Sequence, residues 1–245
     1  MTDVAKLLTN GRRAIALTGA GISVSSGIPT FRGQGGLWSR FDPMEFAHIE
    51  SFRSNPVRSW ELFAELAKGL FAARPNPAHL ALAELEHHGL LRCIITQNID
   101  GLHQAAGSRE VIEFHGNARE LVCLNCRAHY PASMFSFDSL PPYCNCGEIL
   151  KPGAVFFGEP IPKTALLRAY AESQQCQVML VIGTSALVEP AASLPLVAKE
   201  HGAIIVEINP EPSALTATVT DYLLEGEAEV VLPQLAAAAT NYLAI

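Results

Sequence analysis

The sequence of 245 residues contains no apolar run that reaches the roughly 18 residues needed for a membrane-spanning helix. Its N-terminal residues lack the charged-then-apolar arrangement of a secretory signal peptide, so we expect a soluble, cytoplasmic protein with no membrane partner. Positive charge is also scarce, because 17 Lys and Arg stand against 24 Asp and Glu for a net charge of −7. A dedicated nucleic-acid-binding protein carries a basic face, so no direct nucleic-acid partner is expected.

Internal repeats and low-complexity segments are absent as well. Apolar residues make up 49% of the chain, which is enough to build a sizeable core in one large or two modest domains. Cysteine is sparse but unevenly distributed, since four of the six cysteines fall in one short region.

A glycine-rich stretch at residues 18–33 follows a short apolar run, residues 14–17, that is typical of a buried parallel strand. Gly19 and Gly21 permit a tight turn there and let backbone N–H groups come close to a ligand. Ser23 could cap a helix that begins at this point, and a helix N-terminus favours a phosphate.

This stretch departs from the usual dinucleotide fingerprint, because Val24 stands where the third glycine would be. On the glycines alone, nucleotide binding and an ordinary strand-to-helix turn remain equal alternatives. Phe31 and Arg32 favour nucleotide binding, since an aromatic ring can cover a flat ligand ring and a guanidinium can pair with a phosphate or ribose oxygen.

Five further apolar runs alternate with helical stretches, which predicts an α/β fold with a doubly wound parallel sheet. These runs are residues 93–96, 111–114, 178–182, 203–208 and 221–224. Open α/β sheets bind ligands at the carboxyl ends of their strands. We therefore expect the polar and glycine residues that follow the first five strands to face one crevice: 19–23, 97–100, 115–117, 183–185 and Asn209.

Between the first two strands, residues 37–74 carry apolar side chains at roughly helical spacing, which Pro56 and Pro75 interrupt. Most of these side chains are interpreted as core, and the remainder as the lining of a ligand or substrate groove. Asn76 and Pro77 begin the next helix. Its histidines, His79, His87 and His88, are interpreted as surface or capping residues.

The clustered cysteines form two close pairs, separated by 17 residues, that predict a zinc site: Cys123, Cys126, Cys144 and Cys146. Two such turns can face one tetrahedral ion, and Gly147 relieves the backbone of the tighter second pair. Four thiolates leave no open position for water, so the predicted zinc is structural. Two reduced thiol pairs or a redox dithiol are the alternative. Cys93 and Cys176 are interpreted as inert thiols without a partner.

Taken together, these residues closely resemble the sirtuins, the NAD-dependent protein lysine deacylases, over nearly the whole chain and in family order. Besides the four cysteines, the matching motifs are GAGIS (19–23), SGIP (26–29), FRG (31–33), TQNID (96–100), LH (102–103), HGN (115–117), FFGE (156–159) and GTS (183–185). The resemblance implies a Rossmann-like NAD-binding domain over residues 1–36, 76–118 and 153–245. It also implies a smaller domain, formed by a helical insert (37–75) and a zinc module (119–152).

The resemblance further implies which residues hold NAD in the cleft between these domains. The nicotinamide carboxamide would be held by Ile99 and Asp100, and the neighbouring ribose by Gln97 and Asn98. Phe31 would shield the reactive ribose carbon. The remaining expected NAD contacts, to the pyrophosphate and the adenosine half, are Gly19, Ala20, Gly21, Ser23, Thr30, Arg32, Gly183, Thr184, Ser185, Asn209 and Ala228.

His115 is the expected general base, because it follows a strand end beside the predicted nucleotide crevice and titrates near neutral pH. The resemblance adds Asn98 as a second catalytic residue. It also implies an acyl-lysine peptide bound in extended form between two segments, with contacts to Val155, Phe157, Gly158, Glu159, Val188 and Glu189. The implied reaction transfers the acyl group from lysine to ADP-ribose and releases nicotinamide and O-acetyl-ADP-ribose.

Sirtuins that prefer succinyl- or malonyl-lysine carry a Tyr-x-x-Arg pair, and Phe63 and Leu66 occupy those positions here. An apolar wall does not compensate for burying a carboxylate, so we expect acetyl and longer apolar acyl groups to be preferred over acidic ones. Two alternatives stay open: an NAD-dependent ADP-ribosyltransferase or NAD hydrolase, and a non-catalytic NAD-binding module. A monomer is expected.

Overall fold

The computed structural model describes residues 1–32, 35–136 and 140–243, and it contains a six-stranded parallel sheet in the order β3-β2-β1-β7-β8-β9. Gly33 of the sequence motif lies outside the described residues, as do short parts of the predicted ranges 119–152 and 153–245. The strands of this sheet are β1 (Ala14–Thr18), β2 (Cys93–Thr96), β3 (Val111–Glu113), β7 (Val178–Ile182), β8 (Ile204–Asn209) and β9 (Tyr222–Glu225). All six predicted strands are thereby confirmed to within one residue at either end.

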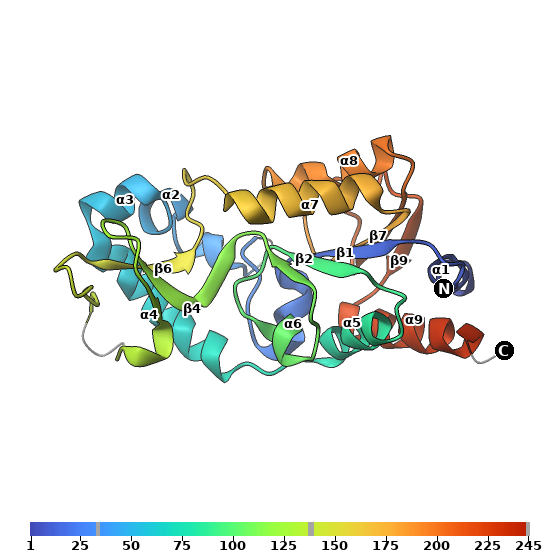
Figure 1. Ribbon diagram of the computed structural model, residues 1–245, viewed down its shortest axis with the longest axis horizontal. Coiled ribbons are helices and arrows are strands. Elements are labelled where there is room, and N and C mark those ends of the chain that lie inside the picture. Colours follow the sequence, from blue (N-terminus) through green and yellow to red (C-terminus); the bar gives the residue numbers. More distant parts are fainter. Residues whose placement is uncertain (33–34, 137–139, 244–245) are drawn as a thin grey trace.

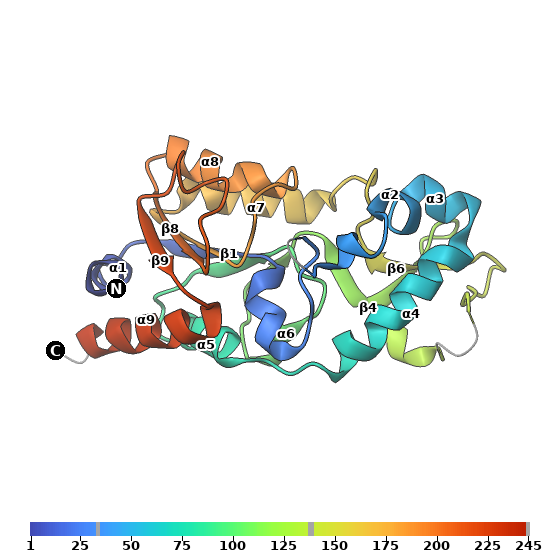
Figure 2. The same ribbon diagram turned by 180° about the vertical axis from the view of Figure 1, so that it is seen from behind.

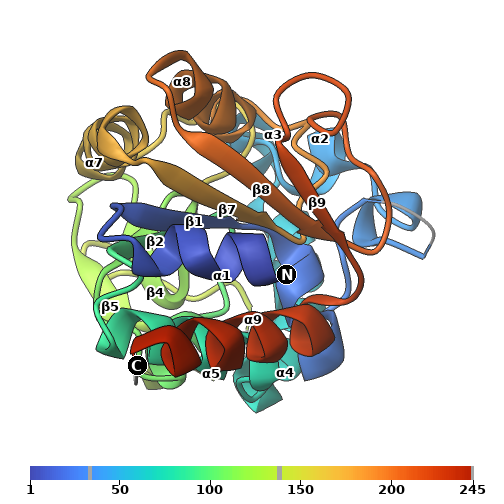
Figure 3. The same ribbon diagram turned by 90° about the vertical axis from the view of Figure 1, so that its right-hand side faces the viewer.

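Helices cover both faces of this sheet because successive side chains of its buried strands point to opposite sides. On β1, Ala14 and Ala16 belong to one apolar cluster, whereas Ile15 and Leu17 belong to another. The first face packs against α1 (Thr2–Thr9), α5 (Pro77–His87) and α9 (Ala228–Leu243), and the second against α7 (Lys163–Gln175) and α8 (Leu194–Glu200). Figure 3, which views the sheet from the end that carries both termini, shows these three layers.

A second, three-stranded antiparallel sheet has the order β5-β4-β6, with bounds of Gly116–Cys123 for β4, His129–Pro131 for β5 and Leu150–Ala154 for β6. It lies beside a helical insert of α2 (Pro43–Phe46), α3 (Ile49–Ser54) and α4 (Pro56–Ala72), at the end of the molecule away from both termini (Figures 1 and 2). A third apolar cluster joins the two, and it includes Trp60 of α4 and Leu121 and Leu150 of the small sheet.

The starts of the insert helices follow from proline and capping residues. Pro56 occupies the first turn of α4, where its missing N–H costs no helical hydrogen bond. Asn76 caps α5 by accepting hydrogen bonds from the backbone of Ala78 and His79, as the sequence predicts. His79 completes the capping box, which confirms its interpretation as a surface or capping residue, and it does so as a fully buried side chain.

The remaining short elements are α6 (Leu102–Ala105) and four 3₁₀ helices, of which η1 (Ala20–Ser26) follows β1 directly. The other three 3₁₀ helices are η2 (Leu37–Ser39), η3 (Ala132–Met134) and η4 (Ala191–Ser193). Of the helices in the described part of the chain, none combines the length and the apolar character needed to cross a bilayer.

Candidate active site

A large cleft of about 1060 Å³ opens where the strand order of the parallel sheet reverses, between β1 and β7. Ligands bind at this switch point in open α/β sheets because the loops from neighbouring strands diverge there. The cleft extends to the helical insert and the small sheet. Of the predicted catalytic, NAD and peptide residues, all except Ser23 and Asp100 line it: Gly19, Ala20, Gly21, Thr30, Phe31, Arg32, Gln97, Asn98, Ile99, His115, Val155, Phe157, Gly158, Glu159, Gly183, Thr184, Ser185, Val188, Glu189, Asn209 and Ala228.

The glycines of the β1 and β7 loops form the floor of the cleft by packing against each other. A Cβ atom on Gly21 would lie 2.6 Å from Gly183 Cα, and one on Gly19 would lie 2.7 Å from Gly183 O. Gly183 itself has a φ of +58°, which L-residues with a side chain seldom adopt. The sequence correctly predicts that another group comes close to the backbone at these glycines. That group is the neighbouring loop of the protein.

The N–H groups of these glycines are consequently used within the protein. Gly19 donates to Ile182 O at 3.0 Å and Gly21 donates to Gly183 O at 2.8 Å. The close approach of backbone N–H groups to a ligand at this turn stays a prediction, and the N–H groups of Gly19 and Gly21 themselves are paired within the protein. A sequence cannot reveal this, because the acceptors lie more than 150 residues away along the chain.

Ser23 and Asp100 do not line the cleft but belong to a polar network beside it, in which Ser23 is buried and Asp100 is half-buried. The Ser23 hydroxyl donates to Asp100 Oδ2 at 2.8 Å and accepts from Asn98 Nδ2 at 3.2 Å. Ser23 lies inside η1, whose N-cap is Gly19, so the prediction that Ser23 caps this helix was wrong. Asp100 lines a smaller adjoining pocket of about 40 Å³, together with Asn98 and Ile99. The direct NAD contacts of Ser23 and Asp100 stay predictions.

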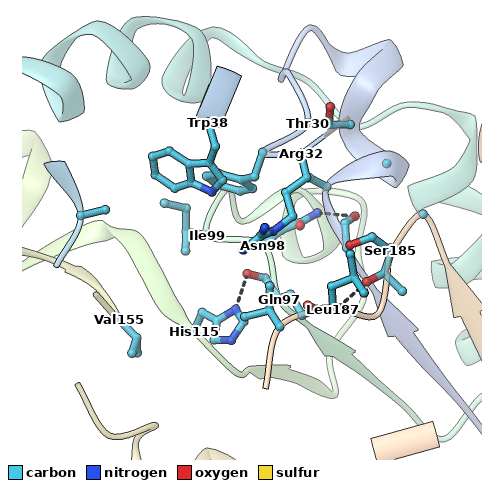
Figure 4. A pocket seen from close by; sticks show the side chains of 18 of the residues that line it. Thr30, Arg32, Trp38, Gln97, Asn98, Ile99, His115, Val155, Ser185 and Leu187 are labelled. Carbon is cyan, nitrogen blue, oxygen red and sulfur yellow. Dashed lines mark hydrogen bonds between the residues drawn. The ribbon is translucent and has the colours of Figure 1, made fainter. Parts of the chain in front are cut away.

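His115 lies between the two sheets, after β3 and immediately before β4. Its Nδ1 lies 3.1 Å from the carbonyl oxygen of Gln97 (Figure 4). A carbonyl only accepts, so this hydrogen bond places the proton on Nδ1 and leaves Nε2 as the basic nitrogen. Burial lowers the pKa of His115, and the Gln97 carbonyl opposes that shift. The imidazole is thus neutral near pH 7, as a general base must be.

The ends of β2, β7 and β8 are joined by hydrogen bonds at the end of the cleft that is predicted to hold the nucleotide, which is called the nucleotide end here. Gln97 Nε2 donates to Thr184 Oγ1 at 3.1 Å, and Asn209 Nδ2 donates to Thr184 O at 3.3 Å. Asn209 is held in turn by the buried carboxylate of Glu207, which also accepts from Ser213 N at 3.1 Å. Gln97, Thr184 and Asn209 were all predicted as site residues. Glu207 was not, because nothing in the sequence distinguishes it from the other residues of its strand.

An aromatic wall closes the opposite side of the cleft. The ring of Trp38 lies 5.5 Å from that of Phe31 and 6.2 Å from that of Phe157, measured between centroids. Figure 4 shows Trp38 above Ile99, with His115 and Val155 on the far side of the cavity. The sequence treats Trp38 as one of many helically spaced apolar residues. The loop 210–214, which follows the end of β8, also lines the cleft, although no site residue was predicted in it.

The insert contributes mostly apolar side chains to one part of the cleft lining, which is called the chamber here. Leu62, Phe63 and Leu66 of α4 line it, together with Phe46 and Ala47. Phe63 and Leu66 lie on one face of α4 because their spacing of three residues is close to one helical turn. Among the described lining residues of the cleft, Arg32 is the one Arg or Lys, and it comes from the nucleotide side.

The segment 155–159 forms one wall of the cleft and is fixed at two points. Val155 N donates to His115 O at 2.8 Å. Phe157 forms a parallel bridge with His48, through hydrogen bonds from Phe157 N to Ala47 O and from Ile49 N to Phe157 O. The segment 187–189, in which Leu187 is exposed, forms the facing wall.

The four predicted cysteines converge at one point of the small sheet, with their sulfur atoms within 4.8 Å of one another. Cys123 and Cys146 approach to 3.5 Å, and so do Cys126 and Cys144. Thiolates around a tetrahedral zinc ion, with bonds of about 2.3 Å, lie about 3.8 Å apart, so the cluster fits such an ion. Gly147 adopts a φ of +89°, as the tight second turn requires. Four sulfur ligands make this a structural site.

Comparisons with known proteins agree with this geometry. The family model described as "Sir2 family" matches residues 19–190. An NAD-dependent protein deacylase of Archaeoglobus fulgidus is 46% identical over 231 residues, which covers 94% of each chain. A solved complex of a Sir2 homologue with NAD is 44% identical, with a TM-score of 0.93, and the match covers 99% of this chain and 95% of that one.

A second solved structure contains Sir2 with a deacetylated p53 peptide and 3′-O-acetyl ADP-ribose. It is 35% identical to this chain, with a TM-score of 0.88, and the match covers 99% of this chain and 98% of the other. The motifs, the reversed strand order with its cleft, the cysteine cluster and these matches over nearly the full length lead to one conclusion: the chain belongs to the Sir2 family, the sirtuins.

Proposed function

We propose that this chain is an NAD-dependent protein lysine deacylase, which transfers the acyl group from lysine to ADP-ribose and releases nicotinamide and O-acetyl-ADP-ribose. The observation that carries the proposal is the position of His115. This neutral, half-buried imidazole lines the cleft together with the segments 155–159 and 187–189 and with the strand ends that are predicted to hold NAD. A positioned base between a dinucleotide and a peptide is what this reaction requires.

Each end of the cleft has groups suited to one substrate. Dinucleotide sites lie at such switch points, and the volume of this cleft is at the upper end of the range of small-molecule sites, roughly 300–1,000 Å³. NAD supplies a glycosidic bond to nicotinamide, which is a good leaving group. Gln97, Asn98 and Ile99 would orient the reacting half of NAD, and Phe31 would exclude water from it.

His115 would then remove a proton from a ribose hydroxyl with its Nε2 atom, while the Gln97 carbonyl holds the Nδ1 proton in place. The peptide would pair through its backbone with the segments 155–159 and 187–189, so that affinity depends little on its sequence. We also propose that the helical insert and the zinc module act together as the small domain, since the third apolar cluster includes residues of both.

The predicted catalytic, NAD and peptide residues, except Ser23 and Asp100, all line the cleft of a single chain. We therefore propose that a monomer is sufficient for activity. We place the protein in the cytoplasm, because reduced thiolates, which the cysteine cluster needs to bind zinc, persist in a reducing compartment.

The proposal is tested by incubating the purified protein with an acetyl-lysine peptide, with and without NAD, while peptide mass and free nicotinamide are followed. Loss of the acetyl group only with NAD, matched one-for-one by nicotinamide, is expected. Release of nicotinamide without peptide would instead support an ADP-ribosyltransferase or NAD hydrolase. Binding of NAD without any reaction would support the alternative of a non-catalytic NAD-binding module.

A further inference from the structure

A lysine is buried beside the peptide wall of the cleft, although it does not line the cleft itself. Lys151 of β6 is only 4% exposed. Transfer of an ammonium group from water to such a site is costly unless every donor finds a partner. Burial accordingly lowers the pKa of Lys151, and the negative charge of Glu159 opposes that shift. A charge in this position calls for an explanation beyond packing.

All three N–H donors of this ammonium have partners within eight residues of the lysine. Nζ donates to Pro152 O at 2.8 Å and to Ala154 O at 2.6 Å, and it forms an ion pair with Glu159 Oε2 at 3.0 Å. The same nitrogen lies 4.2 Å from the centre of the Phe156 ring. The side chain therefore folds over the point where β6 ends and the peptide wall begins.

The contacts of Glu159 complete a closed ring of interactions formed by Lys151, Glu159 and the backbone between them. Its Oε2 atom also accepts from Phe156 N at 2.8 Å, while Glu159 N donates to Phe156 O at 3.0 Å. Its Oε2 atom is thereby committed to Lys151 and to the backbone of Phe156. The charge of Glu159, a predicted peptide contact, is consequently paired with that of Lys151.

The segment enclosed by this ring touches both the predicted base and the insert. Val155 N donates to His115 O, and Phe157 pairs with the backbone on either side of His48. A shift of 155–159 would therefore displace the peptide wall, and also the backbone of His115, while the strand ends at the nucleotide side would stay in place.

We propose that Lys151 is a positioning residue for the acyl-peptide site, which sets the path of residues 155–159 through its ion pair with Glu159 and its bonds to Pro152 and Ala154. This inference rests on the proposed deacylase function, because it assigns these residues to a peptide wall. The alternative is a lysine that contributes to folding alone.

The two roles are separated by measuring the peptide KM, kcat, NAD affinity and melting temperature of Lys151→Met. A positioning role predicts that kcat/KM for the acetyl-lysine peptide falls by about one to two orders of magnitude, because small displacements of bound substrate have effects of that size. NAD affinity should stay within about twofold, since the strand-end contacts are untouched. Lys151→Arg should recover most of the loss.

Two further variants keep the test decisive. Lys151→Met with Glu159→Gln removes the unpaired charge that could unfold the single variant, and its peptide defect should persist. The matched control is Lys199→Met on α8, which breaks the ion pair of Lys199 with Asp221, away from the cleft, and should leave peptide kinetics unchanged. Wild-type peptide kinetics in a folded Lys151 variant, or equal losses of peptide and NAD affinity, would overturn the inference.

A failure of the proposed function would look different from a failure of this inference. If neither wild type nor Lys199→Met consumes the peptide, the deacylase proposal fails. The affinity of a fluorescent acetyl-lysine peptide then decides the role of Lys151: weaker binding by Lys151→Met than by Lys199→Met supports the positioning role, and equal binding overturns it.

Discussion

At the scale of single residues, the tautomer of His115 decides the chemistry. Its hydrogen bond to the Gln97 carbonyl assigns the proton to Nδ1 and the lone pair to Nε2. Replacement of His115 by Ala removes the proton acceptor but leaves the strand-end residues that line the nucleotide end of the cleft. Turnover should fall by about 10²–10⁴, while NAD binding, measured by calorimetry, persists. Turnover close to that of wild type would exclude His115 as the base.

The same residue predicts the pH dependence of the reaction. The pKa of His115 is lowered from its ordinary value of 6.5, chiefly by burial, so the imidazole stays neutral to a lower pH than a histidine in water. A base works only when unprotonated, so kcat/KM should be constant near pH 7 and decline as pH falls through a midpoint below 6.5. A midpoint above 6.5 in the measured pH profile would contradict the assignment.

A further prediction concerns Glu207. Four hydrogen-bond donors converge on its buried carboxylate: Asn209 Nδ2, Ser213 N, Thr216 Oγ1 and Thr220 Oγ1. Burial raises the pKa of this carboxyl, but the hydrogen bonds outweigh burial and hold it below 4.5. Its stabilising effect is thus complete above pH 4.5 and is lost as pH falls through the lowered pKa.

Glu207→Gln replaces one acceptor oxygen by a donor, which leaves buried donors unpaired at a cost of roughly 1–3 kcal/mol. The melting temperature should fall near pH 7, and less so at low pH, where wild type has lost the same contribution. The KM for NAD should rise because Asn209 loses its support. Equal melting temperatures for the two proteins near pH 7 would refute this account.

The lining residues at strand ends, such as Gln97 and Thr184, were predictable from sequence because each follows a strand whose apolar pattern is clear. Others, such as Arg32, followed from the resemblance to the sirtuins. Contacts between segments that are distant in the sequence were not predictable, because no local pattern records them. The bond from Ser23 to Asp100 and the burial of His79 against the His103 ring are examples. A polar residue next to a glycine turn has the same sequence signature whether it faces a ligand or a neighbouring loop.

At the scale of elements, we expect α4 to determine which acyl groups fit. Phe63 and Leu66 present neither a hydroxyl nor a guanidinium to the chamber. A succinyl carboxylate buried there would lack a partner, at a cost of about 1–3 kcal/mol or more. We expect kcat/KM for acetyl-lysine to exceed that for succinyl-lysine by at least about tenfold. Succinyl-lysine turnover that equals acetyl-lysine turnover would show that the acyl group does not enter this chamber.

Substitutions on α4 should shift this preference. Phe63→Tyr with Leu66→Arg supplies a hydrogen-bond donor and a cation one turn apart, so the acetyl-to-succinyl ratio should fall by about tenfold or more. Val57→Arg adds the same charge at an exposed position of the same helix and should leave the ratio unchanged. A similar fall in both variants would mean that net charge, and not the chamber, sets the preference.

The parallel strands were predictable as elements, whereas the small sheet was not. The burial pattern is irregular along β4, and β6 contains Pro152 and Gly153, which are unusual inside a strand. The sequence therefore treats residues 115–117 as the end of a strand, although Gly116 and Asn117 already begin β4.

At the scale of the whole molecule, the cysteine cluster supports one of three apolar clusters. Cys123 and Cys144 belong to the third cluster, with Trp60 and Leu150, whereas the two clusters on the faces of the large sheet contain none of the four cysteines. Trp60 also donates from Nε1 to Leu150 O at 2.8 Å. Loss of the metal should therefore disturb the insert and the small sheet before it disturbs the large sheet.

Metal analysis should find one zinc ion per chain. Exhaustive chelation should shift the emission of Trp60 to longer wavelength and abolish peptide turnover, while NAD binding declines less. Trp38→Phe isolates this signal, because Trp38 and Trp60 are the two tryptophans of the chain. Unchanged emission and turnover in a verified metal-free protein would refute a structural role for the ion.

The mutual contact of the β1 and β7 loops also limits how this chain can evolve. Gly19 and Gly21 meet Gly183 so closely that a methyl group on any of the three would strike the backbone opposite. No compensating substitution exists, because the facing residue is already the smallest. In a library randomised at all three positions and selected for NAD binding, we expect glycine to return at each position in nearly every survivor.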